Sequence, residues 1–443
     1  MPRLILGHTT HNSIKIWLRG SERWPAAFVE LLDEQDHPVG VIKKVLTEAE
    51  EFFTSVIELT QLQANTAYRV KVSFAKTKSA KPDERIRDAY TEGRFKTFSS
   101  PGNGAPFRFL FGSCNLHSLG LVARPDKAWV RISQIARDNN ASFMLHCGDQ
   151  IYADIPLSPP IDIDHYRRKY LDAWEDCVPA RRALTELPHY MILDDHEITN
   201  NFDLQMQAKG RDTDALLRIA MKAYWEFQHS HNPTTTGGAY EYHYRFDCGD
   251  ASFFVMDTRY HRDSSIGRML DENQEADLLR WIGQNPKKLK FIVSGVPFVG
   301  AVLRDGNDKW SHSAFDNQRA RILKRILDVG ASNIIFLTGD MHTSYHATLD
   351  ISEGEQTIRI HELMSSPINQ ITPKTKLQQS FHADLESELP GLKIRSTIDP
   401  HSFYGDHSNV MVVSVAFAGA SPKVSFEIYR TTKNEIGPRG VVD

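Results

Sequence analysis

The chain has 443 residues, more than one hydrophobic core usually supports, so two domains or one large domain with an appended module are expected. Its 52 Lys and Arg residues nearly balance 56 Asp and Glu residues, and the formal net charge of -4 gives no general electrostatic footprint for nucleic acid or an anionic membrane. The four cysteines include no C-x-x-C pair, which argues against a disulfide framework and a structural zinc site.

The sequence contains no run of eighteen apolar residues, so no transmembrane helix is predicted. The amino terminus, Met1 to His8, turns polar too soon for the hydrophobic region of a signal peptide. Sparse cysteines fit a reducing compartment. We therefore expect a soluble, cytoplasmic protein from the sequence as written, and an extracytoplasmic one if a leader has been removed.

Residues 1–98 are predicted to form an antiparallel β-sandwich, because short alternating runs are separated by turn formers. The predicted strands cover residues 13–19, 27–31, 53–59 and 67–72. Residues 62–70, LQANTAYRV, resemble the leucine and tyrosine-corner signature of fibronectin type III domains. Since such modules are usually structural, no chemistry is expected in this domain.

Residues 99–106, SSPGNGAP, read as a linker, and residues 107–443 are predicted to form the second domain. Predicted helices cover residues 127–138, 163–184, 213–229, 272–283 and 314–328. Core strands are expected at residues 251–257 and 289–295, loops or short insertions at 203–213, 232–238 and 370–400, and a further sheet-completing segment at 410–429. Strand-like runs that alternate with helical ones indicate a layered α/β domain.

Four short hydrophobic segments of this domain each deliver Cys, Asp, His or Tyr to their carboxyl ends. These ends are Gly112-Ser113-Cys114-Asn115, His146-Cys147-Gly148-Asp149-Gln150-Ile151-Tyr152, Asp194-Asp195-His196-Glu197 and Gly339-Asp340-Met341-His342. Because layered α/β folds place their sites at the carboxyl ends of strands, one shared metal cluster is expected. Carboxylates suit hard cations, imidazole suits first-row transition metals, and thiolate with phenolate favours Fe(III), so the mixed set predicts more than one metal.

Cys114 is predicted to be a thiolate ligand, with a catalytic nucleophile and a small buried residue as the alternatives. The spacing of Asp149 and Tyr152 lets a carboxylate and a phenolate converge on one ion, although a core tyrosine behind a turn has the same pattern. Asp340 and His342 face the same side if their segment is extended; the alternative is a capped turn with a surface histidine.

Asp195, His196 and Asn200 follow the third strand end. An Asn amide oxygen can coordinate a hard cation, and His196 can donate a proton to a departing alkoxide. Arg259, which follows the predicted strand 251–257, is a candidate phosphate clamp because a guanidinium matches phosphate oxygens. A charge run of this kind is also common in solvated loops.

Together with Asp257-Thr258-Arg259, these motifs resemble, in type and order, the alkaline phosphatase D (PhoD-like) family of metallophosphoesterases, distant relatives of the purple acid phosphatases. The resemblance covers essentially the whole chain. It implies a four-layer α/β/β/α metallophosphoesterase domain preceded by the fibronectin III-like β-sandwich. It also implies a multinuclear site with Fe(III) and additional divalent ions, often Ca²⁺.

The family resemblance also implies which residues hold the metals. Cys114, Asp149 and Tyr152 would hold the iron, with Asp149 bridging. The remaining coordination would come from Asp195, Asn200, Asp340 and His342. Arg259 would hold a non-bridging phosphate oxygen, and His196 would protonate or orient the leaving group.

The expected function is a metal-dependent phosphoesterase, a phosphodiesterase with alkaline phosphatase activity, that activates water for in-line attack on phosphorus. Two alternatives stay open: a hydrolase dependent on Cys114, and a catalytically silent binding or scaffold protein. The expected partner is a phosphate ester, either a small molecule or a polymer. Sugar phosphates, nucleotides, phospholipids and teichoic-acid-like polymers are all compatible with the sequence, which makes no prediction of oligomeric state.

Overall fold

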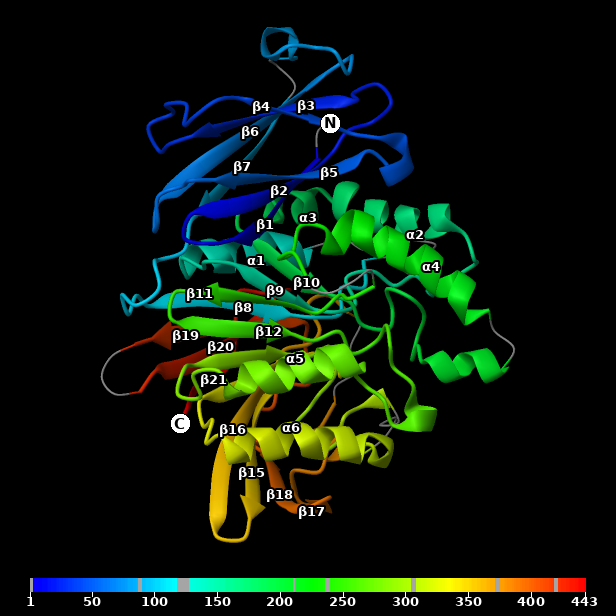
Figure 1. Cartoon of the computed structure of the whole chain (residues 1–443), viewed down its shortest axis with the longest axis vertical. Coiled ribbons are helices and arrows are strands. Elements are labelled where there is room, and N and C mark those ends of the chain that lie inside the picture. Colours follow the sequence, from blue (N-terminus) through cyan, green and yellow to red (C-terminus); the bar gives the residue numbers. More distant parts are fainter. Residues whose placement is uncertain are drawn as a thin grey trace.

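The structure of the chain is a computed structural model that describes residues 3–86, 90–117, 127–209, 212–235, 240–303, 308–370, 375–417 and 421–443. In these ranges, four sheets and seven α-helices are arranged in layers along the long axis of the molecule (Figure 1). Within the described ranges, no helix combines the length and the hydrophobicity needed to cross a lipid bilayer.

Residues 3–86 and 90–96 form two antiparallel sheets. One contains β1 (Arg3–Thr9), β2 (Ser13–Arg19) and β5 (Thr54–Thr60), and the other has the order β4 (Lys43–Leu46), β3 (Ala26–Leu32), β6 (Ala67–Ala75) and β7 (Tyr90–Lys96). Alternate side chains such as Leu6, Ile16 and Val72 are buried between the sheets. The backbone N–H of Gln63 donates to Tyr68 Oη at 3.0 Å, as expected of a tyrosine corner.

Two larger sheets form the centre of the rest of the chain. The six-stranded sheet has the order β10 (His189–Ile192), β9 (Met144–Cys147), β8 (Phe107–Gly112), β19 (Asn409–Ala416), β20 (Lys423–Arg430) and β21 (Ile436–Val442). The eight-stranded sheet has the order β11 (Tyr244–Cys248), β12 (Ala251–Val255), β13 (Lys290–Val293), β14 (Ile334–Thr338), β16 (Gln356–Met364), β15 (Tyr345–Glu353), β18 (Leu392–Ile398) and β17 (Asp384–Leu389). Aromatic rings of Phe109, Phe143, Phe253 and Phe291 pack against one another between the two sheets.

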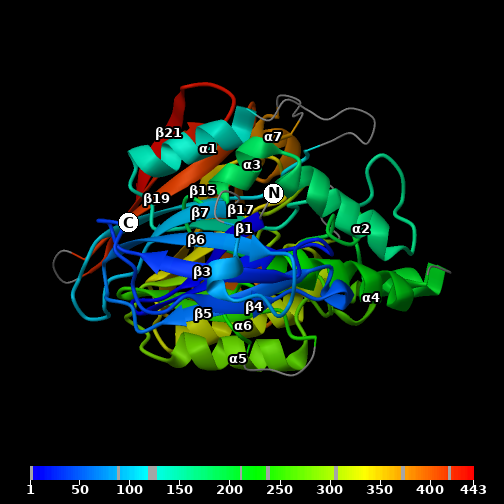
Figure 2. The same ribbon diagram turned by 90° about the horizontal axis from the view of Figure 1, so that it is seen from above.

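Helices cover the outer faces of the two sheets. They are α1 (Lys127–Asp138), α2 (Ile163–Tyr170), α3 (Val178–Ala183), α4 (Thr213–Tyr224), α5 (Glu272–Gly283), α6 (Asp316–Asp328) and the short α7 (Leu377–Ser380). Trp129 and Ile132 of α1 pack on the six-stranded sheet, whereas Leu278 of α5 and Ile322 of α6 pack on the eight-stranded sheet. Figure 2 shows α1 and α3 on one side of the sheets and α5 and α6 on the other. The predicted four-layer α/β/β/α class with a preceding β-sandwich is confirmed.

Two predictions about the elements are wrong. The helix expected at 163–184 is interrupted: α2 runs into a π-helical turn at Leu171–Glu175, and α3 begins after Cys177 with a proline in its first turn. The loop expected at 370–400 contains α7, β17 and β18, although residues 371–374 lie outside the described ranges. Strand β17 escaped prediction because most of its side chains are polar and exposed.

The sandwich docks onto the layer that contains α2, α3 and α4 (Figure 1). Trp17 is buried and its indole N–H donates to the carbonyl oxygen of Glu226 at 2.7 Å. Glu175 accepts from Arg3 Nε at 2.7 Å and from Arg19 Nε at 2.5 Å, although its side chain is only 6% exposed. Since two cations of the sandwich converge on one carboxylate beneath it, this ion-pair cluster ties the two parts of the chain together.

We predict that Glu175→Gln lowers the free energy of unfolding by about 3 kcal/mol, because the substitution leaves two guanidinium groups facing a neutral amide in a mostly buried interface. The matched control is Glu386→Gln. The Glu386 side chain is 76% exposed, so its ion pair with Arg395 should contribute less than about 1 kcal/mol. Urea denaturation measures both. Equal losses in the two variants would show that the Glu175 cluster does not stabilise the interface.

Candidate metal centre

The loops that carry the predicted ligands meet where parallel strands of both large sheets end. Strands β8, β9 and β10 run parallel in one sheet, and β12, β13, β14 and β16 run parallel in the other. Hydrogen bonds join the loops. Cys114 N–H donates to Gly148 O at 3.2 Å, which links the loops that follow β8 and β9. Asp340 N–H donates to Ser113 Oγ at 3.1 Å, which links the ends of the two sheets.

Four carboxylates converge at this junction. One oxygen each from Asp149, Asp194, Asp195 and Asp340 lies within 4.8 Å of the others, and a second such group comprises Asp149, Asp195 and His196. Asp149, Asp194 and Asp195 are buried, and Asp340 is nearly so. Asp149 and Asp195 belong to both groups, so they stand where two neighbouring cation positions would share ligands.

Cys114 and Tyr152 lie beside Asp149. The Cys114 thiol is 3.3 Å from Asp149 Oδ2 and accepts from Ser366 Oγ at 3.2 Å. Tyr152 Oη accepts from Gln370 Nε2 at 3.3 Å. Burial, together with the negative charges of Asp149 and Asp340, raises the pKa of the Cys114 thiol well above its usual range. A cation at the same place would favour the thiolate instead.

The backbone is strained at the same positions. Cys114, Asp149, Asp340 and His342 have φ values of 61°, 57°, 75° and 52°, in the left-handed region that non-glycine residues seldom adopt. The expectation that Asp340 and His342 share a side of an extended segment is therefore wrong. Strain of roughly 1–3 kcal/mol per residue persists only where the surroundings impose it, which is typical of functional loops.

Glu197 and Gly148 fix the loops around Asp194. The buried Glu197 carboxylate accepts from the backbone N–H groups of Asp149 at 3.0 Å, Gln150 at 2.6 Å and Asp194 at 2.8 Å. Gly148 has φ of 94°, and a Cβ there would lie 2.4 Å from Asp194 Cβ. A glycine is thus required at position 148, because its backbone packs closely against the loop that carries Asp194. Glu197 accepts hydrogen bonds from both loops and so fixes their relative position.

His196 lies against the carboxylates and against the Tyr152 ring. Its Nδ1 is 2.7 Å from Asp154 Oδ1, and the centroids of the His196 and Tyr152 rings are 4.1 Å apart. Burial opposes protonation, but the charges of Asp195 and Asp149 and the hydrogen bond with Asp154 outweigh it and raise the pKa of His196 to about 10. In this arrangement His196 carries a proton that it could donate.

His342 and Asn200, two further predicted ligands, lie in neither of the two groups of converging side chains. Burial, together with the positive charge of His196, lowers the pKa of His342 to about 4 and keeps its imidazole in the neutral form that binds metals. Asn200 is exposed, and its backbone N–H donates to Asp154 Oδ2 at 2.8 Å. Among the described contacts, its side-chain amide bonds to none of the four carboxylates, so its ligand role stays a prediction.

Arg259 is buried within the same charge cluster. Its Nε donates to Asp194 Oδ1, and its Nη2 lies 3.0 Å from Asp308 Oδ2 and 3.9 Å from Asp195 Oδ1. The side chain is 0% exposed. A guanidinium that already has three carboxylate neighbours holds Asp194 in place, which the geometry favours over the expected direct clamp on phosphate.

The cluster fits cations. Asp194 Oδ2 and Asp195 Oδ1 are buried without a hydrogen-bond partner in the described part of the chain, and buried carboxylate oxygens of this kind require a cation or a proton. Oxygen donors suit hard cations, and the adjacent thiol, phenol and imidazole groups suit a transition metal.

Sequence reasoning missed five residues of this site: Asp154, Asp194, Glu197, Asp308 and Lys309. Asp194 and Glu197 lay within a recognised motif, where Asp195 alone was chosen as the ligand. Asp154 follows Tyr152 by two residues and could have been found by that proximity. Asp308 and Lys309 follow no predicted strand, so their loop position gave no signal.

The sequence of the chain is similar to a known family and to a characterised protein. Residues 109–399 match the model of the PhoD-like phosphatase family. "Alkaline phosphatase D" of Bacillus subtilis (strain 168) is 23% identical over 401 residues, and the match spans 79% of this chain and 66%, just under two thirds, of that protein.

Two solved structures share the fold. A structure of PhoD superposes with a TM-score of 0.75 at 18% identity, covering 99% of this chain and 88% of that one. A purple acid phosphatase from yellow lupin (Lupinus luteus) seeds gives a TM-score of 0.66 at 12% identity, covering 99% and 73%. With the strand-end ligand motifs inside the matched residues, the family model settles the assignment: the chain belongs to the PhoD-like phosphatase family.

Proposed function

We propose that the protein is a metal-dependent phosphoesterase, a phosphodiesterase that also hydrolyses phosphomonoesters. The observation that carries the proposal is the group of four carboxylates within 4.8 Å of one another, two of which have buried oxygens without a hydrogen-bond partner in the described residues. Membership of the PhoD-like phosphatase family and a fold shared with a purple acid phosphatase support a phosphate ester as the substrate.

In the proposed site, Cys114, Asp149 and Tyr152 would hold Fe(III), and Asp149 would be the ligand shared with a divalent ion such as Ca²⁺. The position of the Cys114 thiol 3.3 Å from Asp149 supports this assignment. The remaining coordination comes from Asp195, Asn200, Asp340 and His342, to which the carboxylate group adds Asp194 as a candidate. Such cations lower the pKa of a bound water and neutralise phosphate charge.

The protein's own residues orient the reaction around this centre. Asp154 forms a hydrogen bond with His196 Nδ1, and the Tyr152 ring packs against the His196 ring. These two neighbours fix the orientation of the protonated imidazole. In this role His196 gives its proton to the departing alkoxide oxygen, which is general acid catalysis. Arg259 keeps Asp194 in position and supplies positive charge behind the carboxylates.

A hydrolase that uses Cys114 as its nucleophile receives less support. Among the described residues, the polar groups within hydrogen-bonding reach of its sulfur are those of Ser113, Ser366, Asp149 and Tyr152 and the backbone oxygen of Asp340, and none of these is an imidazole base. The raised pKa disfavours a thiolate in the absence of a cation. The scaffold alternative differs from the proposal in predicting neither bound metal nor hydrolysis.

Removal of metal tests the proposal directly. We expect a strong chelator to abolish hydrolysis of an aryl phosphodiester and of an aryl phosphomonoester, and iron with a divalent ion to restore it, because the carboxylates alone cannot neutralise the reacting phosphate. Thiol alkylation of the metal-loaded protein is the control. Activity that survives chelation but not alkylation would contradict the metal-dependent mechanism.

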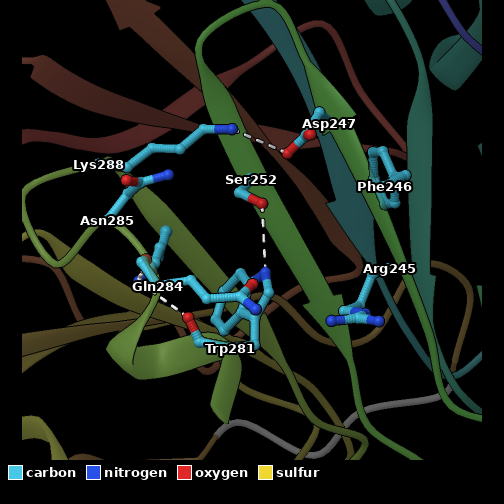
Figure 3. Close-up of a pocket in the computed structure, with 9 residues that line it drawn as sticks. Arg245, Phe246, Asp247, Ser252, Trp281, Gln284, Asn285 and Lys288 are labelled. Carbon is cyan, nitrogen blue, oxygen red and sulfur yellow. Dashed lines mark hydrogen bonds and ion pairs between the residues drawn. The ribbon is translucent and has the colours of Figure 1, made fainter. Parts of the chain in front are cut away.

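Asp149→Asn should reduce both metal content and hydrolysis by at least about a hundredfold, because Asp149 belongs to both ligand groups and an amide cannot bridge cations as a carboxylate does. Asp247→Asn is the matched control, since this exposed carboxylate pairs with Lys288 (Figure 3) and lies opposite Ser252, near the amino-terminal end of β12. Elemental analysis and steady-state kinetics measure the effects. Full metal content in Asp149→Asn would refute its bridging role.

Tyr152→Phe should weaken iron binding and remove the visible absorption band that a phenolate-to-iron charge transfer produces, because the variant lacks the phenol oxygen. Tyr90→Phe, which changes a 44% exposed side chain of the sandwich, should leave the spectrum unchanged. Absorption spectroscopy of the iron-loaded proteins makes the comparison. An unchanged band in Tyr152→Phe would exclude this residue as an iron ligand.

A further inference from the structure

Among the residues whose burial the structure describes, two lysines, Lys290 and Lys309, are almost fully buried, and they serve different purposes. Lys290 Nζ donates to the carbonyl oxygens of Trp281 at 3.0 Å, Ile282 at 2.6 Å and Gln284 at 2.5 Å. An ammonium group has three N–H donors, so all three are used at the carboxyl end of α5. Lys290 therefore has a structural role.

The pocket beside Lys290 offers no free cation either. In Figure 3, Lys288 points toward Asp247, and the two side chains are 3.0 Å apart. Arg245 lies 3.5 Å from Asp277. Because each cation there has an acidic partner or is saturated by carbonyl groups, this pocket carries no anion-binding site.

Lys309 differs from Lys290 in its partners. Its Nζ lies 2.8 Å from Asp308 Oδ2 and 2.5 Å from Asp340 Oδ2. The Asp308 contact is a hydrogen bond and the Asp340 contact is an ion pair, so at least one of the three N–H donors of Lys309 has no acceptor in the described ranges. Asp340 also belongs to the four-carboxylate group. The Lys309 ammonium, with its unused N–H donor, therefore contacts a carboxylate that would itself contact the proposed cations.

Lys309 is the most exposed of the three cations in its charge cluster, which also contains Arg259 and Arg262. The side chains of Arg259 and Arg262 are 0% exposed, whereas those of Lys309 and Asp340 are 6% and 14% exposed. A compact ammonium on a flexible stem is a common binder of phosphate oxygens. A phosphate drawn to cations at Asp340 would meet the Lys309 ammonium before it could reach either arginine.

We propose that Lys309 is a substrate-binding residue whose ammonium donates to a phosphoryl oxygen in the metal-loaded site. The inference rests on the proposed phosphoesterase function and adds to it a residue that binds the phosphoryl group shared by all phosphate esters. The rival role is purely structural, in which Lys309 only neutralises Asp308 and Asp340 and holds them in position.

The test compares the metal-loaded wild type with Lys309→Met, Lys309→Gln and the control Lys288→Met. Three quantities are measured: metal content by elemental analysis, affinity for inorganic phosphate by calorimetry, and kcat and KM for an aryl phosphomonoester. We expect both Lys309 variants to retain metal and to bind phosphate about ten- to a hundredfold more weakly, as for the loss of a hydrogen bond to a charged group. KM should rise in parallel, and Lys288→Met should match wild type.

Lys309→Gln keeps a polar side chain for Asp308 and provides a folded variant if Met is not tolerated. Loss of metal from the Lys309 variants would overturn the proposal in favour of the structural role, and phosphate affinity equal to wild type with full metal content would overturn it outright. Failure of the phosphoesterase proposal itself is recognised separately, because the metal-loaded wild type would then neither bind phosphate nor hydrolyse the ester.

Discussion

Four carboxylates brought within 4.8 Å of one another in a buried junction repel each other strongly, and this repulsion is the constraint on which the site depends. At that separation each like-charged pair costs about 3 kcal/mol at an effective dielectric constant near 20. Arg259 and Lys309 offset part of this cost. Cations bound in the proposed site would offset the rest.

The scaffold holds this unfavourable arrangement through rigid strands and a few exacting contacts. Parallel strands of two sheets end at the same junction, so their loops leave the core with fixed directions. One carboxylate, Glu197, fixes three backbone N–H groups of the ligand loops. Left-handed backbone at Cys114, Asp149 and Asp340 then turns the side chains toward one another. The packing of the sheets therefore keeps the loops in this arrangement despite the charge repulsion and the backbone strain.

The convergence of the strand-end loops could be predicted from the sequence. Apolar strands followed by Cys, Asp or His are recognisable in the local sequence, and parallel strands end at the same edge of a sheet. The sandwich was predictable from its alternating runs between turn formers, and the four layers followed from the resemblance to the PhoD-like family. The positive φ of Asp340 and His342 was not, since no glycine marks it. Asp308 and Lys309 sit on a loop whose path depends on the rest of the fold, and the three carboxylate partners of Arg259 come from distant segments.

The most direct test of the account is anomalous X-ray diffraction at the iron absorption edge, from crystals of active protein purified without chelator. The account predicts an anomalous peak bounded by Cys114, Asp149 and Tyr152, with a second cation beside Asp195. Crystals of fully active protein without anomalous density between these residues would contradict the claim that the convergent strand ends form an iron-containing catalytic centre.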